Sequence, residues 1–254
     1  MIVTAWHRQE QRDLFCKAWN ITTDYPNVLL VQDVNHEGCA ATKNKGVEVA
    51  MRQGAEIVVV LDDDCFPSAE APDLETLAAK HSAALNCQDV DAFRVVTNPP
   101  SRGTPYFNRT TAMPVAASMG FWNEVPDYDA AHQLVNGARH PMEFHRATIY
   151  GQYFPLCGMN LAFRPRKWLP WCRFINVPRF DDIWMGWLWQ KKAYAEGYCF
   201  NLNGPLITHS RQSDVFQNLR DEAKYLEHNE ILWSLLASSP EKEYDELVKL
   251  LHGK

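Results

Sequence analysis

The sequence has no apolar run near the roughly 18 residues that a membrane-spanning helix needs. Its first residues lack the basic-then-apolar pattern of a secretory signal, and no internal repeat or low-complexity segment follows. The seven cysteines are an odd number and form no C-x-x-C pair, which argues against both a zinc site and a disulfide framework. We therefore expect a soluble cytoplasmic protein with reduced thiols and no membrane partner.

An excess of positive charge is also missing. The formal net charge of −6 argues against a protein that coats polyanions in general, although it leaves a local basic patch open. Hydrophobic residues make up 46% of the 254 residues, enough to bury a sizeable core. We expect a single domain over residues 1–254, in which residues 211–254 form a C-terminal helical region. Nothing in the sequence indicates an oligomeric state.

The N-terminal part of the chain alternates apolar, strand-like runs with helical segments. They follow one another as strand 1–6, helix 9–20, strand 27–34, helix 40–54 and strand 56–61. Gly54 is expected to end the second of these helices. The alternation predicts an α/β fold with a mostly parallel central sheet flanked by helices.

Three consecutive aspartates, Asp62, Asp63 and Asp64, follow the third predicted strand. Open α/β sheets bind ligands outside the carboxyl ends of their strands. A D-x-D pair there offers the oxygen ligands that Mg²⁺ or Mn²⁺ prefers, and a nucleotide diphosphate would complete the coordination shell. Such a metal would neutralise a departing diphosphate. The alternative is a solvated turn, in which aspartates are common.

A second carboxylate pair, Asp181 and Asp182, opens a helical segment at residues 181–197. One of the two is expected to act as a base or to bind sugar hydroxyls. The alternative is a helix N-cap with an acid in the first turn. His209 directly follows an apolar segment and is either a structural histidine or an imidazole ligand beside the carboxylates.

Gly158, Met159 and Asn160 lie inside a hydrophobic stretch. The glycine is compatible with a bulged strand. It is equally compatible with a ligand that approaches the backbone closely, with Asn160 donating hydrogen bonds to it.

Together these segments resemble one family, the reversibly glycosylated polypeptides, whose plant members include UDP-arabinopyranose mutases. The resemblance covers roughly residues 56–220. It implies the GT-A glycosyltransferase fold, which is Rossmann-like, together with a UDP-sugar donor and Mn²⁺ or Mg²⁺. The motifs that carry it, in order, are LDDDCFP, VPDYDAAHQLV, PLCGMNLAF, RFDDIWMGW and ITHSRQSDVFQNL.

Carried over by position, the resemblance implies that Asp62 and Asp64 hold the metal and that His209 is a further ligand. Asp181 or Asp182 would face the sugar as the catalytic carboxylate. By analogy with GT-A enzymes, Asp33 after the second strand would contact the uracil or ribose. The residues expected to bind the donor are then Asp33, Asp63, Gly158, Met159 and Asn160.

The chain departs from the family where a reversibly glycosylated arginine is expected. The matching position holds Thr110, and Arg109 is its neighbour. This departure puts self-glycosylation and mutase activity in doubt, while donor binding is unaffected.

A second departure is a basic and aromatic stretch after the Gly-Met-Asn motif. Its residues are an expected acceptor site if the acceptor is nucleic acid, because cations contact phosphates and aromatic rings stack on bases. The alternative is a solvated basic loop with buried tryptophans. The residues of this predicted acceptor site are Arg164, Arg166, Lys167, Trp168 and Arg173.

The sequence therefore predicts an enzyme, a metal-dependent glycosyltransferase with a UDP-sugar donor. The sequence leaves the acceptor open; if it is nucleic acid, a hydroxymethylated pyrimidine in DNA is the expected target, which must be flipped or single-stranded to react. One alternative is a UDP-sugar mutase, in which the sugar itself is the acceptor. A second alternative is a non-catalytic protein that binds a nucleotide-sugar.

Overall fold

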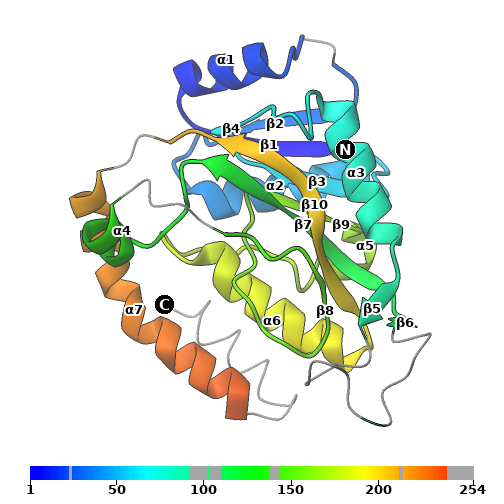
Figure 1. Cartoon of the computed structure of the whole chain (residues 1–254). Coiled ribbons are helices and arrows are strands. Elements are labelled where there is room, and N and C mark those ends of the chain that lie inside the picture. The colour runs from blue at the N-terminus through cyan, green and yellow to red at the C-terminus, as the bar shows by residue number, and fades with distance from the viewer. Residues whose placement is uncertain (23–24, 92–101, 103–109, 138–142, 212–213, 239–254) are drawn as a thin grey trace.

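The computed structural model describes residues 1–22, 25–91, 102, 110–137, 143–211 and 214–238 (Figure 1). The helices are α1 (Gln9–Ala18), α2 (Cys39–Arg52), α3 (Leu74–Asn86), α4 (Ala130–Asn136), α5 (Pro165–Trp168), α6 (Asp181–Ala195) and α7 (Val215–Ser238). The strands are β1 (Ile2–Trp6), β2 (Val28–Gln32), β3 (Val58–Leu61), β4 (Cys65–Phe66), β5 (Asp89–Asp91), β6 (Thr110–Ala112), β7 (Val115–Glu124), β8 (Thr148–Ile149), β9 (Asn160–Phe163) and β10 (Cys199–His209).

The predicted alternation of strands and helices at the N-terminus is confirmed. β1 pairs in parallel with β2 on one side and with β3 on the other, and α2 packs against all three strands. α2 ends at Arg52, two residues before Gly54, whose φ of 87° lies in the left-handed region that glycine adopts without strain. The carboxyl ends of these three strands therefore share one edge of the sheet.

The central sheet is mixed, so the prediction of a mostly parallel sheet is wrong. Its order is β2-β1-β3-β9-β7-β10-β4, with β8 paired to β10. β9 is antiparallel to both of its neighbours, β3 and β7, whereas β7 and β10 are parallel to each other. Because β9 runs opposite to both β3 and β7, the strands β7 and β10 run in the same direction as β3. Their carboxyl ends reach the edge at which the aspartates lie.

Helices cover both faces of this sheet, as the alternating side chains of β10 show. Phe200 packs against Trp189 of α6, with ring centroids 5.4 Å apart. The next residue, Asn201, points the other way and donates to the carbonyl of Ala84 in α3, at 2.9 Å. The buried apolar side chains form one cluster that runs through the sheet and both layers.

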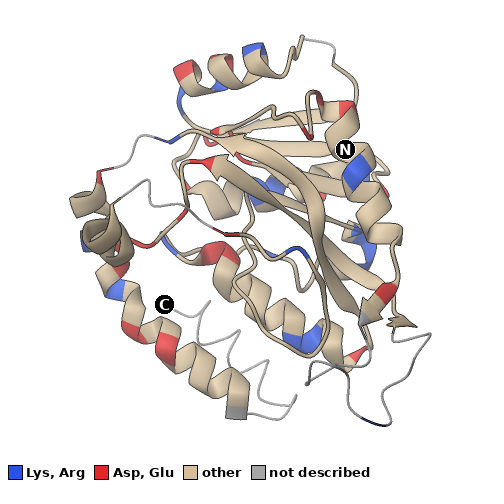
Figure 2. Cartoon of the chain, in the orientation of Figure 1, with Lys and Arg blue, Asp and Glu red and all other residues tan. Residues whose placement is uncertain are grey.

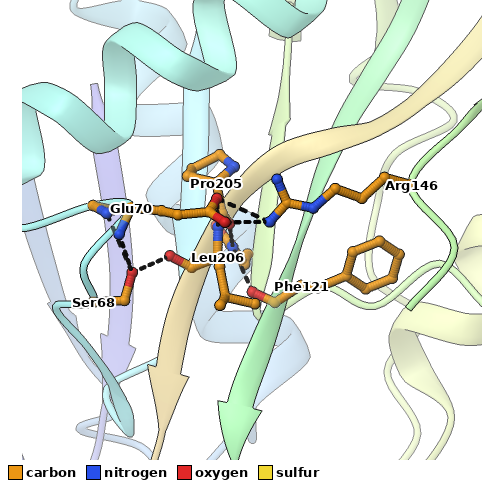
Figure 3. Close-up of polar contacts among 8 residues, drawn as sticks. Ser68, Glu70, Phe121, Arg146, Pro205 and Leu206 are labelled. Carbon is orange, nitrogen blue, oxygen red and sulfur yellow. Dashed lines mark hydrogen bonds and ion pairs between the residues drawn. The ribbon is translucent and has the colours of Figure 1, made fainter. Parts of the chain in front are cut away.

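β10 carries an irregularity at Pro205 and Leu206, where its register against β7 shifts. Figure 3 shows how the backbone there is satisfied: Glu70 accepts from Leu206 N at 3.1 Å and from Arg146, and Ser68 donates to Leu206 O. Asn160 donates to Pro205 O at 2.8 Å. These contacts hold the last residues of β10 beside β4.

The chain after β10 forms α7, which contacts α4 and α6. Trp187 of α6 packs against Trp233 of α7, with ring centroids 5.6 Å apart. The rest of the C-terminal region that was expected to be helical, residues 239–254, lies outside the described residues. No helix in the described part of the chain is both long and apolar enough to span a membrane.

Candidate functional site

A cavity of about 550 Å³ opens at the edge where the strands end. It lies beside the start of α6, which carries acidic residues (Figure 2). The sheet brings together residues that lie far apart in the sequence. The predicted site residues that line the cavity are Asp33, Asp62, Asp63, Asp64, Met159, Asp181, Asp182 and His209.

Asp62, the first of the three aspartates, is paired with a lysine. Lys43 Nζ of α2 lies 2.6 Å from Asp62 Oδ1, and the lysine side chain is only 5% exposed. Burial alone would lower the pKa of the Lys43 ammonium, but the charge of Asp62 outweighs it and the pKa lies well above its usual value. Burial and the Asp64 charge in turn favour the neutral acid at Asp62. Because the contact is so short, we take the pair as ionised.

Asp64 lies beside His209, as the resemblance implied. Asp64 Oδ2 is 3.5 Å from His209 Nε2. His209 Nδ1 is 2.7 Å from the carbonyl oxygen of Val125, which can only accept, so Nδ1 carries a proton and donates it. Nε2 is thereby directed at the carboxylate. Burial opposes the charged form of each partner, but their mutual attraction prevails, so the pKa of Asp64 is lowered and that of His209 is raised.

Asp63 and Asp181 are carboxyls that favour the protonated form. Burial, followed by the charges of Asp64 and Asp62, raises the pKa of Asp63 to about 7. Burial and the adjacent Asp182 raise the pKa of Asp181 to about 7 as well. Carboxyls with such values can take up and release protons near neutral pH.

The two aspartates at the start of α6 differ in their contacts. Asp182 Oδ2 accepts from Gly158 N at 2.7 Å and Asp182 Oδ1 accepts from Ile183 N at 2.8 Å. The side chain of Asp181 meets only the adjacent backbone N–H of Asp182 and is not held by another element among the described residues. The N-cap is Phe180, in the left-handed region with a φ of 64°, so the interpretation of either aspartate as the N-cap is wrong. Asp182 is held in place, whereas Asp181 is free to act on a ligand.

The predictions missed Asp127, which also lines the cavity. Its side chain is exposed, but it faces a cavity whose walls shield it from bulk water. Burial and the charge of Asp182 raise the pKa of Asp127 to about 6. The motif VPDYDAAHQLV contained this residue, but neither spacing nor composition set it apart from Asp129.

Two exposed arginines, Arg8 and Arg211, add positive charge to the lining. Neither makes an ion pair within the described part of the chain. Arg8 follows β1 and Arg211 follows β10, so both come from strand ends at the same edge as the aspartates. They provide cations for an anionic group of a ligand.

Asp33 lies at the cavity, but its carboxylate is engaged by its own loop. Oδ1 accepts from Glu37 N at 2.8 Å and Oδ2 accepts from Gly38 N at 2.9 Å. Burial opposes ionisation, but these two hydrogen bonds together outweigh it, so the pKa of Asp33 is lowered. The carboxylate of Asp33 therefore orders the loop before α2. A ligand could still donate hydrogen bonds to the remaining lone pairs of this carboxylate.

The Gly-Met-Asn motif divides between the site and the core. Gly158 precedes β9, and a Cβ there would lie 2.5 Å from Phe174 Cε1 and 3.0 Å from Asp182 Cβ, so close packing and not a strand bulge requires the glycine. Met159 lines the cavity. Asn160 is fully buried and accepts from His81 Nε2 at 2.8 Å while donating to Pro205 O. Its amide is engaged within the core, so these contacts give no support to the predicted role in donor binding.

The first residues of the basic and aromatic stretch lie away from the cavity, whereas Phe174 near its end contacts Lys43, which lines the cavity. β9 is antiparallel, so it begins at the cavity with Asn160 and carries the following residues away from it. Trp168 is 2% exposed and packs against Trp189 and Tyr198, which leaves no free ring face for a base. Of the two readings of this stretch, buried tryptophans beside a solvated basic loop fits the contacts.

The four basic residues of this stretch are not gathered for a nucleic acid, and basic positions are spread over several elements in Figure 2. Arg164 donates to Asn86 Oδ1, and Arg173 pairs with Glu48 at 3.2 Å. None of the five residues predicted to bind the acceptor lines the cavity. Lys167 pairs with Glu196 and Arg166 is exposed.

The position matched to the family's glycosylated arginine lies in β6. Thr110 pairs with Asp91 of β5 in a separate two-stranded sheet, and it does not line the cavity. Arg109 lies outside the described residues.

The fit of a divalent cation can be tested on these contacts. No group of three or more histidine, cysteine, aspartate or glutamate side chains in the described residues is arranged to hold a metal ion. Asp64 and His209 do converge, and the Nδ1 bond to a carbonyl is the arrangement that orients metal-binding histidines. The protein thus offers two ligands, which suits Mg²⁺ or Mn²⁺ when substrate phosphates and water supply the rest.

Comparison with known proteins gives a family. Residues 34–239 match the family described as reversibly glycosylated polypeptide. The chain is 31% identical over 183 residues to probable UDP-arabinopyranose mutase 1 of Pisum sativum, covering 66% of this chain and 50% of the relative. It is 29% identical over 227 residues to UDP-arabinopyranose mutase 3 of Arabidopsis thaliana, covering 78% of this chain and 61% of the relative. The chain spans about half the length of most curated relatives it matches.

Proposed function

This chain belongs to the reversibly glycosylated polypeptide family, and on that premise we propose that it is a UDP-sugar mutase. It would bind a UDP-linked sugar in the acidic cavity and rearrange the sugar without passing it to a separate acceptor. Several relatives bear the name UDP-arabinopyranose mutase, which favours an arabinose-type sugar. We also propose the GT-A fold, supported by the aspartates that follow the third strand of a β-α-β-α-β unit.

The observation that carries this proposal is that the cavity lining holds two chemically different groups of residues. In one, the charged carboxylate of Asp64 lies beside the imidazole of His209. In the other, the carboxyl of Asp181 is bound by no other element among the described residues and has a pKa of about 7. A nucleotide-sugar has the same division, because its diphosphate is anionic and its sugar is rich in hydroxyls.

The diphosphate would lie near Asp64 and His209. A divalent cation bound there would neutralise the diphosphate as the bond to the sugar breaks. Asp64 and His209 would provide its protein ligands, and Arg8 and Arg211 would attract the same anionic group from the rim. A buried salt bridge between Asp62 and Lys43 forms the wall beside them.

Asp181 would accept and donate the proton that is transferred during the rearrangement. When the ring form of a sugar changes, one hydroxyl becomes the ring oxygen and the former ring oxygen becomes a hydroxyl. A proton therefore leaves one oxygen and another oxygen gains one, with no net change. A carboxyl whose pKa is near 7 can accept the first proton and return the second. Asp182, fixed by the backbone N–H of Gly158, would keep Asp181 in a low-dielectric, acidic setting.

Transfer to DNA is the weaker reading, because its predicted acceptor site does not reach the cavity and Trp168 is buried. A non-catalytic protein that binds UDP-sugars would have the same cavity and is distinguished by the absence of product.

The test is to incubate the protein with a panel of radiolabelled UDP-sugars and Mn²⁺, with and without single-stranded DNA containing a hydroxymethylated pyrimidine. Protein, DNA and small molecules are then separated. A mutase leaves the label in an isomeric UDP-sugar, and the Asp181→Asn variant should not form it. Label in the DNA would contradict the proposal and favour a glycosyltransferase. Intact substrate that nevertheless binds would favour a non-catalytic binding protein.

A further inference from the structure

Lys43 stands out because a buried ammonium occupies the wall of an acidic cavity. It belongs to α2, whereas its partner Asp62 follows β3, so the pair joins two elements. Lys43 Nζ lies 2.6 Å from Asp62 Oδ1 and 5.1 Å from the centre of the Phe174 ring. The aromatic face adds to the stabilisation of the charge. The lysine is therefore held on two sides.

The geometry limits what Asp62 can do. Its Oδ1 faces the ammonium at hydrogen-bond distance, while its side chain is 27% exposed. A divalent cation bound to this carboxylate would come close to Lys43, and like charges repel. Because the lysine is 5% exposed, it has no free path to move into water. The carboxylate that begins the D-x-D pair is thus already neutralised by the protein.

Asp64 is in a different position. Its partner His209 is an imidazole, whose neutral ring has a lone pair that can bind a metal, whereas the ammonium beside Asp62 has only donors. The Nδ1–H of His209 donates to Val125 O, so the lone pair of the neutral ring would be on Nε2, the atom that faces Asp64. The two aspartates of the D-x-D pair therefore have different chemical roles.

We propose that Asp62 is not a metal ligand but the counter-ion of the buried Lys43, and that the protein holds the cation through Asp64 and His209 alone. This inference rests on the proposed function, because it concerns the metal that accompanies the UDP-sugar. Two protein ligands leave most of the coordination shell to phosphate oxygens and water. The cation therefore binds together with the diphosphate and only weakly to the protein without nucleotide.

The experiment measures UDP affinity by calorimetry with and without Mn²⁺ in the wild-type protein and in Asp62→Asn and Asp64→Asn. The two substitutions are matched, because each replaces a carboxylate by an amide of the same shape. The ratio of the two dissociation constants is the metal increment. Asp64→Asn should reduce it by about 10-fold or more, as expected when a contact to the metal is lost. Asp62→Asn should keep it within about threefold of the wild-type value.

Asp62→Asn leaves Lys43 buried beside a neutral amide, which can prevent folding. The double variant Lys43→Met with Asp62→Asn removes both charges, and melting temperatures show which variants are folded. The double variant should also keep the metal increment. Titration of Mn²⁺ without UDP should give little heat in the wild-type protein.

An equal loss of the increment in Asp62→Asn and Asp64→Asn would overturn the inference, as would tight binding of Mn²⁺ without nucleotide. Loss of the increment in a folded double variant would overturn it as well. A wild-type protein that binds UDP with no metal increment would contradict the proposed metal site itself, and the inference with it. A wild-type protein that does not bind UDP would contradict the proposed function. The failures of the two proposals are therefore distinguishable.

Discussion

Lowering the pH should destabilise the protein through His81, which is fully buried in α3. Its Nε2 is 2.8 Å from Asn160 Oδ1 and its Nδ1 is 2.9 Å from Ser118 Oγ. Asn160 uses its amide nitrogen for Pro205 O, so its oxygen must accept and His81 Nε2 must donate. Nδ1 then accepts from the Ser118 hydroxyl. A second proton on the ring would break that bond and place a charge in the core.

The magnitude follows from the pKa. Burial lowers the pKa of His81 from 6.5 to about 4, against the opposing effect of the hydrogen bond that His81 donates to Asn160. The difference, 6.5 − 4, is about 2.5 units, and each unit corresponds to about 1.4 kcal/mol. The unfolded state binds the proton more tightly, so this stability is fully present above pH 6.5 and is lost as the pH falls towards 4. Between pH 7.5 and pH 5.0 the loss is about 2 kcal/mol.

Other groups oppose this trend. The pKa of Asp63 and of Asp181 is raised to about 7, so the folded state binds their protons more tightly and is favoured as the pH falls below 7. The total slope therefore mixes two signs. Denaturant unfolding of the wild-type protein and of His81→Gln at each pH isolates the histidine, because the carboxyl contributions cancel in the difference.

His81→Gln should be less stable than the wild-type protein at pH 7.5, since glutamine cannot make both hydrogen bonds. The difference should shrink by about 2 kcal/mol at pH 5.0. Ser118→Ala, which removes one hydrogen bond but keeps the ring, should retain a pH-dependent loss. Free energies of unfolding that stay parallel for the wild-type protein and His81→Gln over this range would refute the reasoning.

Three further substitutions test other parts of the structure. Asp181→Asn should lower turnover by about 10²-fold or more with UDP affinity nearly unchanged, which kinetics and calorimetry measure together; a purely structural carboxyl would leave the rate intact. Gly158→Ala should cost about 1–3 kcal/mol in denaturant unfolding, because the new Cβ would lie 2.5 Å from Phe174 Cε1, and equal stability would exclude that contact. Glu70→Ala should cost about 1–3 kcal/mol and speed hydrogen exchange at the Leu206 amide, which loses its acceptor. An unchanged exchange rate there would show that water replaces the carboxylate.

The N-terminal half of the sheet and the place of the aspartates could be predicted from local patterns. The spacing of hydrophobic residues indicates the alternation of strands and helices. Because ligands bind at the carboxyl ends of strands, Asp62, Asp63 and Asp64 could then be predicted to lie at a binding site. The start of α6 followed from the acids Asp181 and Asp182 before an apolar face.

The direction of β9 could not be predicted. Four residues, Asn160–Phe163, form this strand, and an apolar run that short contains no signal for parallel or antiparallel pairing. Its direction is set by its neighbours β3 and β7, which lie far away in the sequence. The error had a consequence for the site: the sequence did not show that the chain moves away from the cavity along β9 before it reaches Arg164.

The sequence also did not indicate which polar side chains are buried. Lys43 lies in a helix, where a charged residue usually faces water, and only the distant Asp62 makes its burial tolerable. Asn160 looked like a ligand-binding amide because it follows a glycine in an apolar stretch. It is instead the partner of His81, which lies 79 positions away. Contacts of this kind depend on tertiary structure and leave no local pattern.

The most direct test of the central claim is to approach equilibrium from both sides. The protein is incubated with Mn²⁺ and UDP-arabinopyranose in one reaction and with its five-membered-ring isomer in another, and the two UDP-sugars are separated by chromatography over time. A mutase gives the same final ratio from either substrate, and Asp181→Asn reaches it far more slowly. Conversion in neither direction, or release of free sugar or transfer of the sugar to another molecule in place of isomerisation, would contradict the claim.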